Sequence, residues 1–292
     1  MRDNAWPLYC NARLIAAVAL ARRQLPGHGE QASERVHGVR KTLKEARALA
    51  RLFRPCLGEP ARVTIAGLAV VRRRVGRGRD LDVIEARLTR LAPPSQVAAS
   101  LLEAIRRERA AASRADGGFA TSASRSQLNA MGKRLEALDL KKVAADDIVE
   151  AVARTYRQAR RRGRVAFASD DPAALHALRA RVIDLRYQLA ALSPAQPAAL
   201  GAQSEELNAL RDTLGDFNDL HMLATFATER AFLMLEAQAE LTARLAAKQK
   251  KLRRRAETEF DRLFAETPDA FFERLSAYLR RPVEKPKAPR VA

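Results

Sequence analysis

Apolar residues recur along this chain at intervals of three and four positions, the spacing that gathers side chains on one face of an α-helix. From position 36 onward, for example, Val39, Leu43, Ala46, Ala50 and Phe53 fall on one side of a helix, and charged residues fill the positions between them. No segment alternates apolar and polar residues in the way that a half-buried strand does. The pattern therefore predicts an all-α fold.

Proline, glycine and small polar residues separate the periodic segments. PGHG at 26–29, the proline pair after Leu91 and SPAQP at 193–197 predict turns, and 115–124 predicts a loop. The Pro- and Lys-rich residues 282–292 are typical of a disordered tail. The predicted helices span 8–25, 32–54, 60–75, 79–91, 96–113, 124–138, 146–164, 171–192, 202–214, 218–254 and 256–280, with a break inside 218–254 left open.

Two pairs of sequence blocks repeat at one fixed offset of 139 residues. VHGVRKTLKEAR, from Val36, matches LHALRARVIDLR, from Leu175, and a second pair of blocks places Asp80 over Asp219 and Gly76 over Gly215. Two linked matches at one offset are a poor fit to chance and indicate an internal repeat. We expect a first helical bundle over 1–140 and a second over 141–281, related by a pseudo-twofold axis within one compact domain.

The helix that carries His37 presents a column of cations beside its apolar face. At about 100° per residue, His37, Arg40, Lys41, Lys44, Arg47 and Arg51 share about a third of the circumference. Neighbouring like charges on a helix repel each other, and this stripe contains no acid to offset them. The pattern therefore favours an external anion as its partner.

The second copy of this stripe is weaker. His176, Arg179 and Arg186 share a face, but Ile183 stands where the first copy has Lys44, and Asp184 lies to the side. If the stripe binds anions, the first half contributes more. The residues that we expect to contact the anion are His37, Arg40, Lys41, Lys44, Arg47, Arg51, Arg72, Arg79, Arg157, His176, Arg179, Arg186 and Arg211.

The overall charge is consistent with this stripe. The 292 residues carry a formal net charge of +19, which attracts nucleic acid, an anionic membrane or a phosphate polymer. Aromatic residues make up only 5%, which argues against base stacking on single strands. The two cysteines, Cys10 and Cys56, have no metal or disulfide spacing and favour a reducing, cytoplasmic compartment. The apolar run 14–20 predicts part of a first helix, not a leader or a membrane span.

The histidines leave three interpretations open. His37 and His176 can donate to an anion, can be buried and bonded to backbone or to Asp80 and Asp219, or can ligate a metal, and we favour the first. No second ligand lies at metal spacing, so we expect no metal and no cofactor. Asp80 and Asp219 are expected to orient a stripe arginine or to cap a helix.

No nucleophile–base set, Walker-type loop or HExxH motif occurs, and we expect no enzyme activity.

These residues resemble the CHAD family, the conserved-histidine α-helical domain. VHGVRKTLKEARALARLFRP and LHALRARVIDLRYQL resemble its two histidine helices, GRGRDLDV and LGDFNDLHM its two aspartate blocks, and ARTYRQARR, around Tyr156, the helix that opens its second half. ETEFD at 257–261 lacks the lysine of the ExExK hallmark of a triphosphate tunnel domain, so the chain resembles a stand-alone member.

The resemblance implies two helical bundles around a basic surface and a central pore that binds inorganic polyphosphate and targets polyphosphate granules. A non-sequence-specific nucleic-acid-binding protein is the alternative that the charge also allows. An enzyme that acts on polyphosphate is a third possibility, for which the sequence offers no metal-binding carboxylates. The oligomeric state and the preferred chain length stay open.

Overall fold

A computed structural model describes residues 5–25, 32–75, 79–91, 96–115, 119–230 and 235–280, and every regular element in these ranges is helical, as predicted. The first half contains α1 (Ala5–Gln24), α2 (Ala32–Ala50), the 3-10 turn η1 (Arg51–Phe53), α3 (Arg54–Leu57), α4 (Glu59–Val75), α5 (Arg79–Leu91), α6 (Gln96–Ala115) and α7 (Phe119–Glu136). The second half contains α8 (Ala145–Phe167), α9 (Pro172–Leu192), the 3-10 turn η2 (Ser193–Ala195), α10 (Pro197–Arg230), α11 (Leu235–Leu263) and α12 (Pro268–Leu279).

Local signals in the sequence begin two of the second-half helices. The Asp171 side chain accepts a hydrogen bond from the backbone N–H of Ala173, and Pro172 occupies the first turn of α9. Thr267 caps α12 in the same way, and Pro268 follows it. A cap with a proline behind it ends the preceding helix, so the single helix predicted over 256–280 is instead the end of α11 followed by α12.

A second boundary also differs from the prediction. The sequence predicts separate helices over 202–214 and 218–254, but α10, which is 34 residues long, runs through Gly215 without a break. The chain leaves this helix only after Arg230. The helix predicted over 32–54 ends at Ala50 and passes into η1 and α3.

The order of the helices repeats at the offset of 139 residues. On this count α1 and α2 correspond to α8 and α9, while α4 and α5 correspond to the two parts of the continuous α10. The two histidine helices, α2 and α9, pack against each other, and α5 packs against α10. The pseudo-twofold axis itself stays a prediction.

One large hydrophobic core joins the two halves. Its buried members include Trp6 and Leu43 from the first half and Leu185 and Phe271 from the second, so the predicted units 1–140 and 141–281 share their interior. A second, smaller core forms where α5 and α6 meet the ends of α10 and α11, around Ile105. The predicted disordered tail, 282–292, lies outside the described residues.

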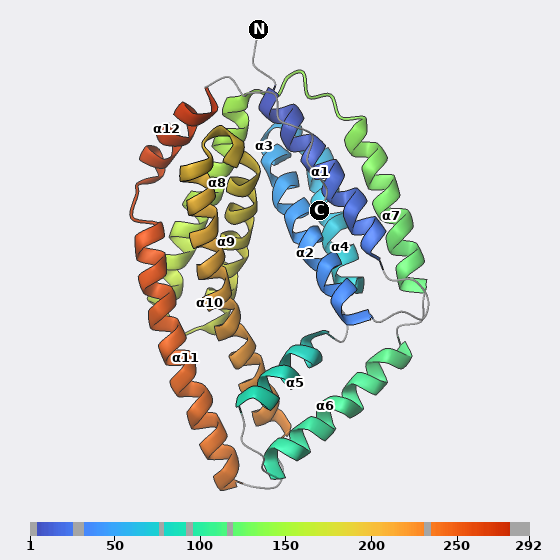
Figure 1. Ribbon diagram of the computed structural model, residues 1–292, viewed down its shortest axis with the longest axis vertical. Coiled ribbons are helices and arrows are strands. Elements are labelled where there is room, and N and C mark those ends of the chain that lie inside the picture. The colour runs from blue at the N-terminus through green and yellow to red at the C-terminus, as the bar shows by residue number, and fades with distance from the viewer. Residues whose placement is uncertain are drawn as a thin grey trace.

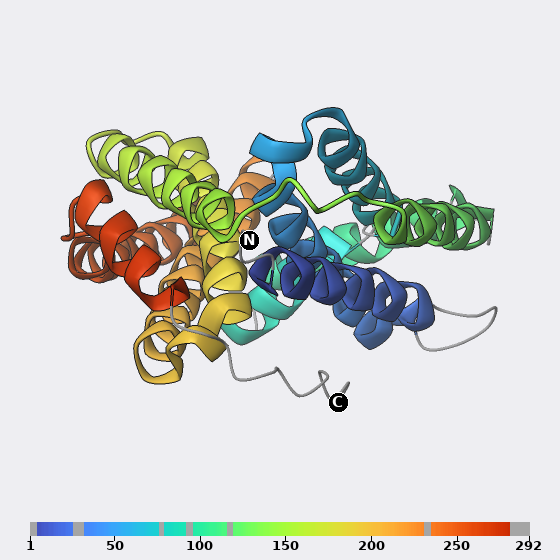
Figure 2. The ribbon, with the colours of Figure 1, turned by 90° about the horizontal axis from the view of Figure 1, so that it is seen from above.

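Figure 1 shows α1, α2, α4 and α7 beside α8, α9, α10 and α12, with α5 and α6 below them. Seen from above, in Figure 2, the blue and green helices of the first group lie next to the yellow and red helices of the second. Among the described helices, none combines the length and the apolar character that crossing a membrane requires.

Candidate functional site

A cavity of about 370 Å³ lies where the two halves meet. It is formed by α2, α4 and α5 from the first half and by α9 and α10 from the second, and we call it the central pocket. Its lining is Arg40, Lys44, Arg47, Arg72, Asp80, Val83, His176, Arg179, Ala180, Ile183, Asn218, Asp219 and Met222.

The α2 wall of the central pocket is a row of cations. Arg40, Lys44 and Arg47 project from one face because their spacing of four and three residues brings them round the helix together. Leu43 and Ala46, between them in sequence, are buried in the large core and fix the rotation of α2. Packing of the apolar face of α2 in the core therefore places its basic face against the pocket.

The cations that line the pocket lie close enough to repel one another. Burial lowers the pKa of Arg72, which joins from α4, and the charges of Arg40 and Arg73 lower it further, with Asp80 opposing them. Burial also lowers the pKa of Arg47, and so does the charge of Arg72. Cations that are partly desolvated and close together gain when an anion enters between them.

The α9 wall carries the second copy of the pattern in altered form. His176, Arg179 and Ile183 line the pocket, and Ile183 also packs on Ala48 in a small apolar cluster. Arg179 lies against Gly215 of α10, where a Cβ would stand 3.1 Å from its Nη2 atom. The lack of a side chain at this glycine therefore makes room for the guanidinium.

The two histidines are both exposed, which argues against the buried structural interpretation. Nδ1 of His176 lies 3.1 Å from Oδ1 of Asn218, within the central pocket, whereas His37 is on α2 outside its lining. The part of the chain that the structure describes contains no group of three or more His, Cys, Asp or Glu side chains that could hold a metal ion.

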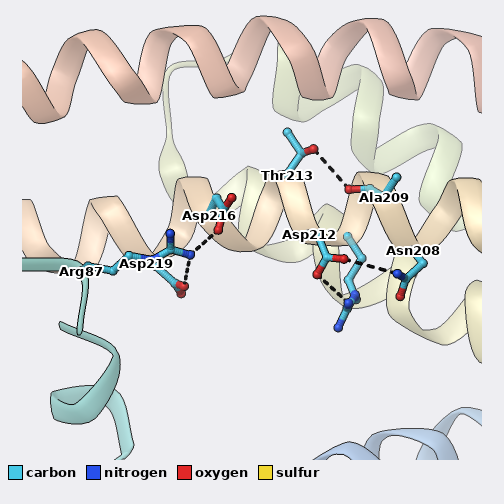
Figure 3. A network of polar contacts seen from close by, with 8 residues as sticks. Arg87, Asn208, Ala209, Asp212, Thr213, Asp216 and Asp219 are labelled. Atoms are coloured by element: carbon cyan, nitrogen blue, oxygen red, sulfur yellow. Dashed lines mark hydrogen bonds and ion pairs between the residues drawn. The ribbon is translucent and has the colours of Figure 1, made fainter. Parts of the chain in front are cut away.

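The two aspartates of the repeat both line the pocket, and Asp219 pairs with Arg87, which is not a stripe residue. Arg87 of α5 donates to Asp219 at 2.9 Å and also to Asp216, so one guanidinium joins two carboxylates of α10 (Figure 3). Arg87 therefore offsets the negative charge that Asp219 brings to a cationic pocket, and it ties α5 to α10. Arg87 carried no sequence signal, because its partners lie about 130 residues away in the chain.

Several predicted residues lie outside the central pocket. Lys41 is exposed on α2, and the side chain of Arg79 lies outside the described residues. Arg157 pairs with Glu150 at 2.6 Å, Arg211 pairs with Asp212 at 2.5 Å, and the guanidinium of Arg186 lies 4.6 Å from the ring centre of Tyr187. The structure brings together Arg40, Lys44, Arg47, Arg72, His176 and Arg179.

Arg51 and Asp184 form a buried ion pair next to the pocket. Nη1 of Arg51 lies 2.7 Å from Oδ1 of Asp184, which has no solvent exposure, and Arg181 binds the other carboxylate oxygen at 3.0 Å. The sequence pattern puts Asp184 to the side of the second stripe and does not single out Arg181. A lone acid between apolar residues was the available signal, since a buried carboxylate requires partners.

Comparisons with known proteins identify the family to which the chain belongs. No curated protein matches the sequence. Among solved structures, PptA from Streptomyces chartreusis is 18% identical with a TM-score of 0.63 over 88% of this chain and 98% of its own. The CHAD domain from the plant Ricinus communis is 19% identical with a TM-score of 0.60 over 96% of this chain and 93% of its own. The profile of the CHAD domain matches residues 12–228, and the chain belongs to the CHAD family.

Proposed function

We propose that this protein binds inorganic polyphosphate in the central pocket. The observation that carries the proposal is the convergence of five cationic side chains from both halves on one cavity of about 370 Å³. These are Arg40, Lys44, Arg47, Arg72 and Arg179. Two carboxylates share the lining, and Arg87 offsets one of them, so the charge of the pocket remains positive.

The side chains suit the chemistry of a phosphate polymer. A polyphosphate carries about one negative charge per bridging phosphate along an uninterrupted chain, and arginine can grip phosphate oxygens with its fork of N–H donors. Lysine adds a mobile point charge. Because several such contacts act on one linear molecule, binding becomes tight without any single strong contact.

The pocket is a poorer match to nucleic acid, the alternative that net charge allows. A cavity of about 370 Å³ is far too small to admit a duplex. No aromatic residue is among its described lining, so bases of a single strand have no stacking platform there. Duplex DNA could still lie on the basic surface, and the experiment below compares both ligands.

We further propose that the protein binds without catalysing a reaction and that it associates with polyphosphate granules in the cytoplasm. In support, the polar lining consists of four arginines, a lysine, one asparagine, His176 and two aspartates, and His176 is paired with Asn218 instead of a nucleophile. Release of orthophosphate from polyphosphate during incubation with Mg²⁺ or Mn²⁺ would overturn the first proposal. A fluorescently tagged protein that fails to co-localise with granules would overturn the second.

The binding proposal is tested by titration with long-chain polyphosphate, orthophosphate and duplex DNA in one buffer at two salt concentrations. We expect polyphosphate to bind most tightly and to weaken as salt rises. A variant with Arg40→Ala, Lys44→Ala and Arg47→Ala loses this binding and keeps its helical circular dichroism, because alanine is a good helix former. DNA binding that is equal to or tighter than polyphosphate binding would overturn the proposal.

The control variant loses the same charge at exposed positions outside the pocket lining. Arg62, Arg107 and Arg244 have side chains 63%, 73% and 51% exposed, and their replacement by alanine removes three positive charges. We expect this variant to retain most of its affinity. If both triple variants lose the same affinity, polyphosphate binding depends on the net charge of the protein and not on the central pocket.

A further inference from the structure

A second group of arginines adjoins the central pocket around the buried carboxylate of Asp184. Arg51 and Arg181 bind its two oxygens, with side chains only 18% and 15% exposed. Arg162 reaches this place from α8, where its Nη1 donates to the backbone oxygen of Ala177, one turn before Arg181 on α9. η1 and α9 thus bring guanidinium groups into contact with one carboxylate, and α8 brings a third guanidinium close enough to feel its charge.

Two exposed arginines extend the group to the surface. Arg54 follows Arg51 by three residues, and Arg161 precedes Arg162. We call Asp184, its partners Arg51 and Arg181, and the neighbouring Arg54, Arg161 and Arg162 the Asp184 cluster. Arg47 connects it to the pocket, because Arg47 lines the pocket and interacts electrostatically with both Asp184 and Arg181.

The Asp184 cluster has more positive charge than its carboxylate can offset. Burial lowers the pKa of Arg51 to about 10, and the charges of Arg181, Arg47 and Arg54 act in the same direction against Asp184. Burial lowers the pKa of Arg162 as well, and Arg181 and Arg161 add to the effect. In both cases Asp184 is the one carboxylate that opposes the shift.

Hydrogen-bonding groups in this region are also incompletely satisfied. The Nε atoms of Arg47 and Arg181 are buried and donate to no acceptor among the described residues, and Oδ2 of Asp184 accepts no hydrogen bond there either. A buried donor without an acceptor is costly, and an anion that approaches such groups removes the cost. Excess positive charge and unused donors occur together from Arg47 to Arg181.

We propose that the Asp184 cluster is a second phosphate subsite, which binds the continuing chain of a polyphosphate whose first part occupies the central pocket. This inference rests on the proposed function. Asp184 acts as the positioning residue: it holds Arg51 and Arg181 in place and leaves the cluster positively charged. Arg162 and Arg161 contact the polymer beyond Arg47.

A second subsite makes affinity depend on the length of the ligand. Tripolyphosphate fits one subsite at a time and gains nothing from the cluster while it occupies the pocket. A long chain that is held in the pocket meets the cluster at high effective concentration, so its affinity rises by more than its number of phosphates accounts for. Loss of the cluster therefore selectively weakens the binding of long chains.

The test is calorimetric titration of the full chain with tripolyphosphate and with long-chain polyphosphate. We expect Arg162→Ala to lower the long-chain affinity by about tenfold, the effect of one charge-assisted contact, and to change tripolyphosphate affinity by less than about twofold. We expect the double variant Arg54→Ala, Arg161→Ala, at two exposed positions, to give the same selective loss with its fold retained. Arg107→Ala on α6 is the matched control for one charge and changes neither affinity.

Three outcomes separate this inference from the proposed function. If both ligands weaken equally in the cluster variants, or if neither weakens, the second subsite does not exist. If tripolyphosphate and long-chain polyphosphate both fail to bind the unaltered protein, the proposed function is wrong. If tripolyphosphate binding is lost in Arg40→Ala but persists in Arg162→Ala, the pocket and the cluster are separate subsites as proposed.

Discussion

Arg51 at the start of η1 is joined to Asp184 in the middle of α9 by an ion pair of 2.7 Å whose carboxylate has no solvent exposure. The same carboxylate also pairs with Arg181, so its removal leaves two largely buried guanidinium groups without their counter-ion. We expect Asp184→Ala to lower the free energy of unfolding by about 3–5 kcal/mol, measured by urea denaturation. Glu59→Ala, which breaks a pair 63% exposed on both sides, should cost at most about 1 kcal/mol. Equal effects would mean that the buried pair contributes no more than a surface pair.

Gly215 and Gly201 offer a matched pair of substitutions in α10. A methyl group at Gly215 stands 3.1 Å from Nη2 of Arg179 and displaces this guanidinium, whereas a methyl group at Gly201 meets nothing within 4 Å. Both alanine variants gain up to about 1 kcal/mol from helix propensity. We expect only Gly215→Ala to weaken polyphosphate binding, by roughly threefold to tenfold in a titration. Unchanged affinity in Gly215→Ala would show that the position of Arg179 does not matter for the ligand.

Gly163 allows α8 to approach α11. A Cβ at this position would lie 2.0 Å from the ring of Phe260, which is itself packed between Phe167 and Phe264. We expect Gly163→Ala to lower the free energy of unfolding by about 1–3 kcal/mol or more, because the ring has no room to move. Gly132→Ala in α7, with nothing within 4 Å, should instead be neutral or stabilising. Thermal and urea unfolding of the two variants compare them directly.

Because the thiol of Cys10 is buried, we expect the free energy of unfolding to fall at alkaline pH. Burial raises its pKa from the ordinary 9.0 to about 12, with Arg13 partly opposing the shift. The unfolded chain releases this proton above pH 9 and the folded chain retains it, so rising pH favours unfolding. We expect a contribution of up to about 1.4 kcal/mol per pH unit between pH 9 and 12. Urea denaturation at several pH values should show a shallower decline in Cys10→Ala, and identical slopes would contradict the assignment.

The part of the site that lies on α2 could be predicted because its signal is local. Arg40, Lys44 and Arg47 share a face whatever the helix packs against, and the apolar positions beside them show which face is buried. The all-helical fold could be predicted for the same reason. Apolar residues that recur every three or four positions match the turn of a helix, and this match can be recognised without knowing which helices pack together.

The contacts between helices could not be predicted in this way. Arg87 meets Asp216 and Asp219 from a distance of about 130 residues along the chain, and Ile183 is buried because α2 brings Ala48 to it. Gly215 predicted a helix end, but neighbouring buried residues, among them Leu214, hold α10 together across it. Tertiary packing thus overrode a local preference of about 1 kcal/mol.

The central pocket takes its walls from two separately packed interiors. α2 and α9 belong to the large core through Leu43 and Leu178, whereas the α5 side, with Ile84 and Leu88, belongs to the smaller one. A ligand held between these walls binds only when both interiors are folded. Binding of the anion in the pocket is therefore thermodynamically linked to the folding of both cores. The bound anion stabilises the folded state of the two parts together, and this stabilisation is lost when the anion dissociates.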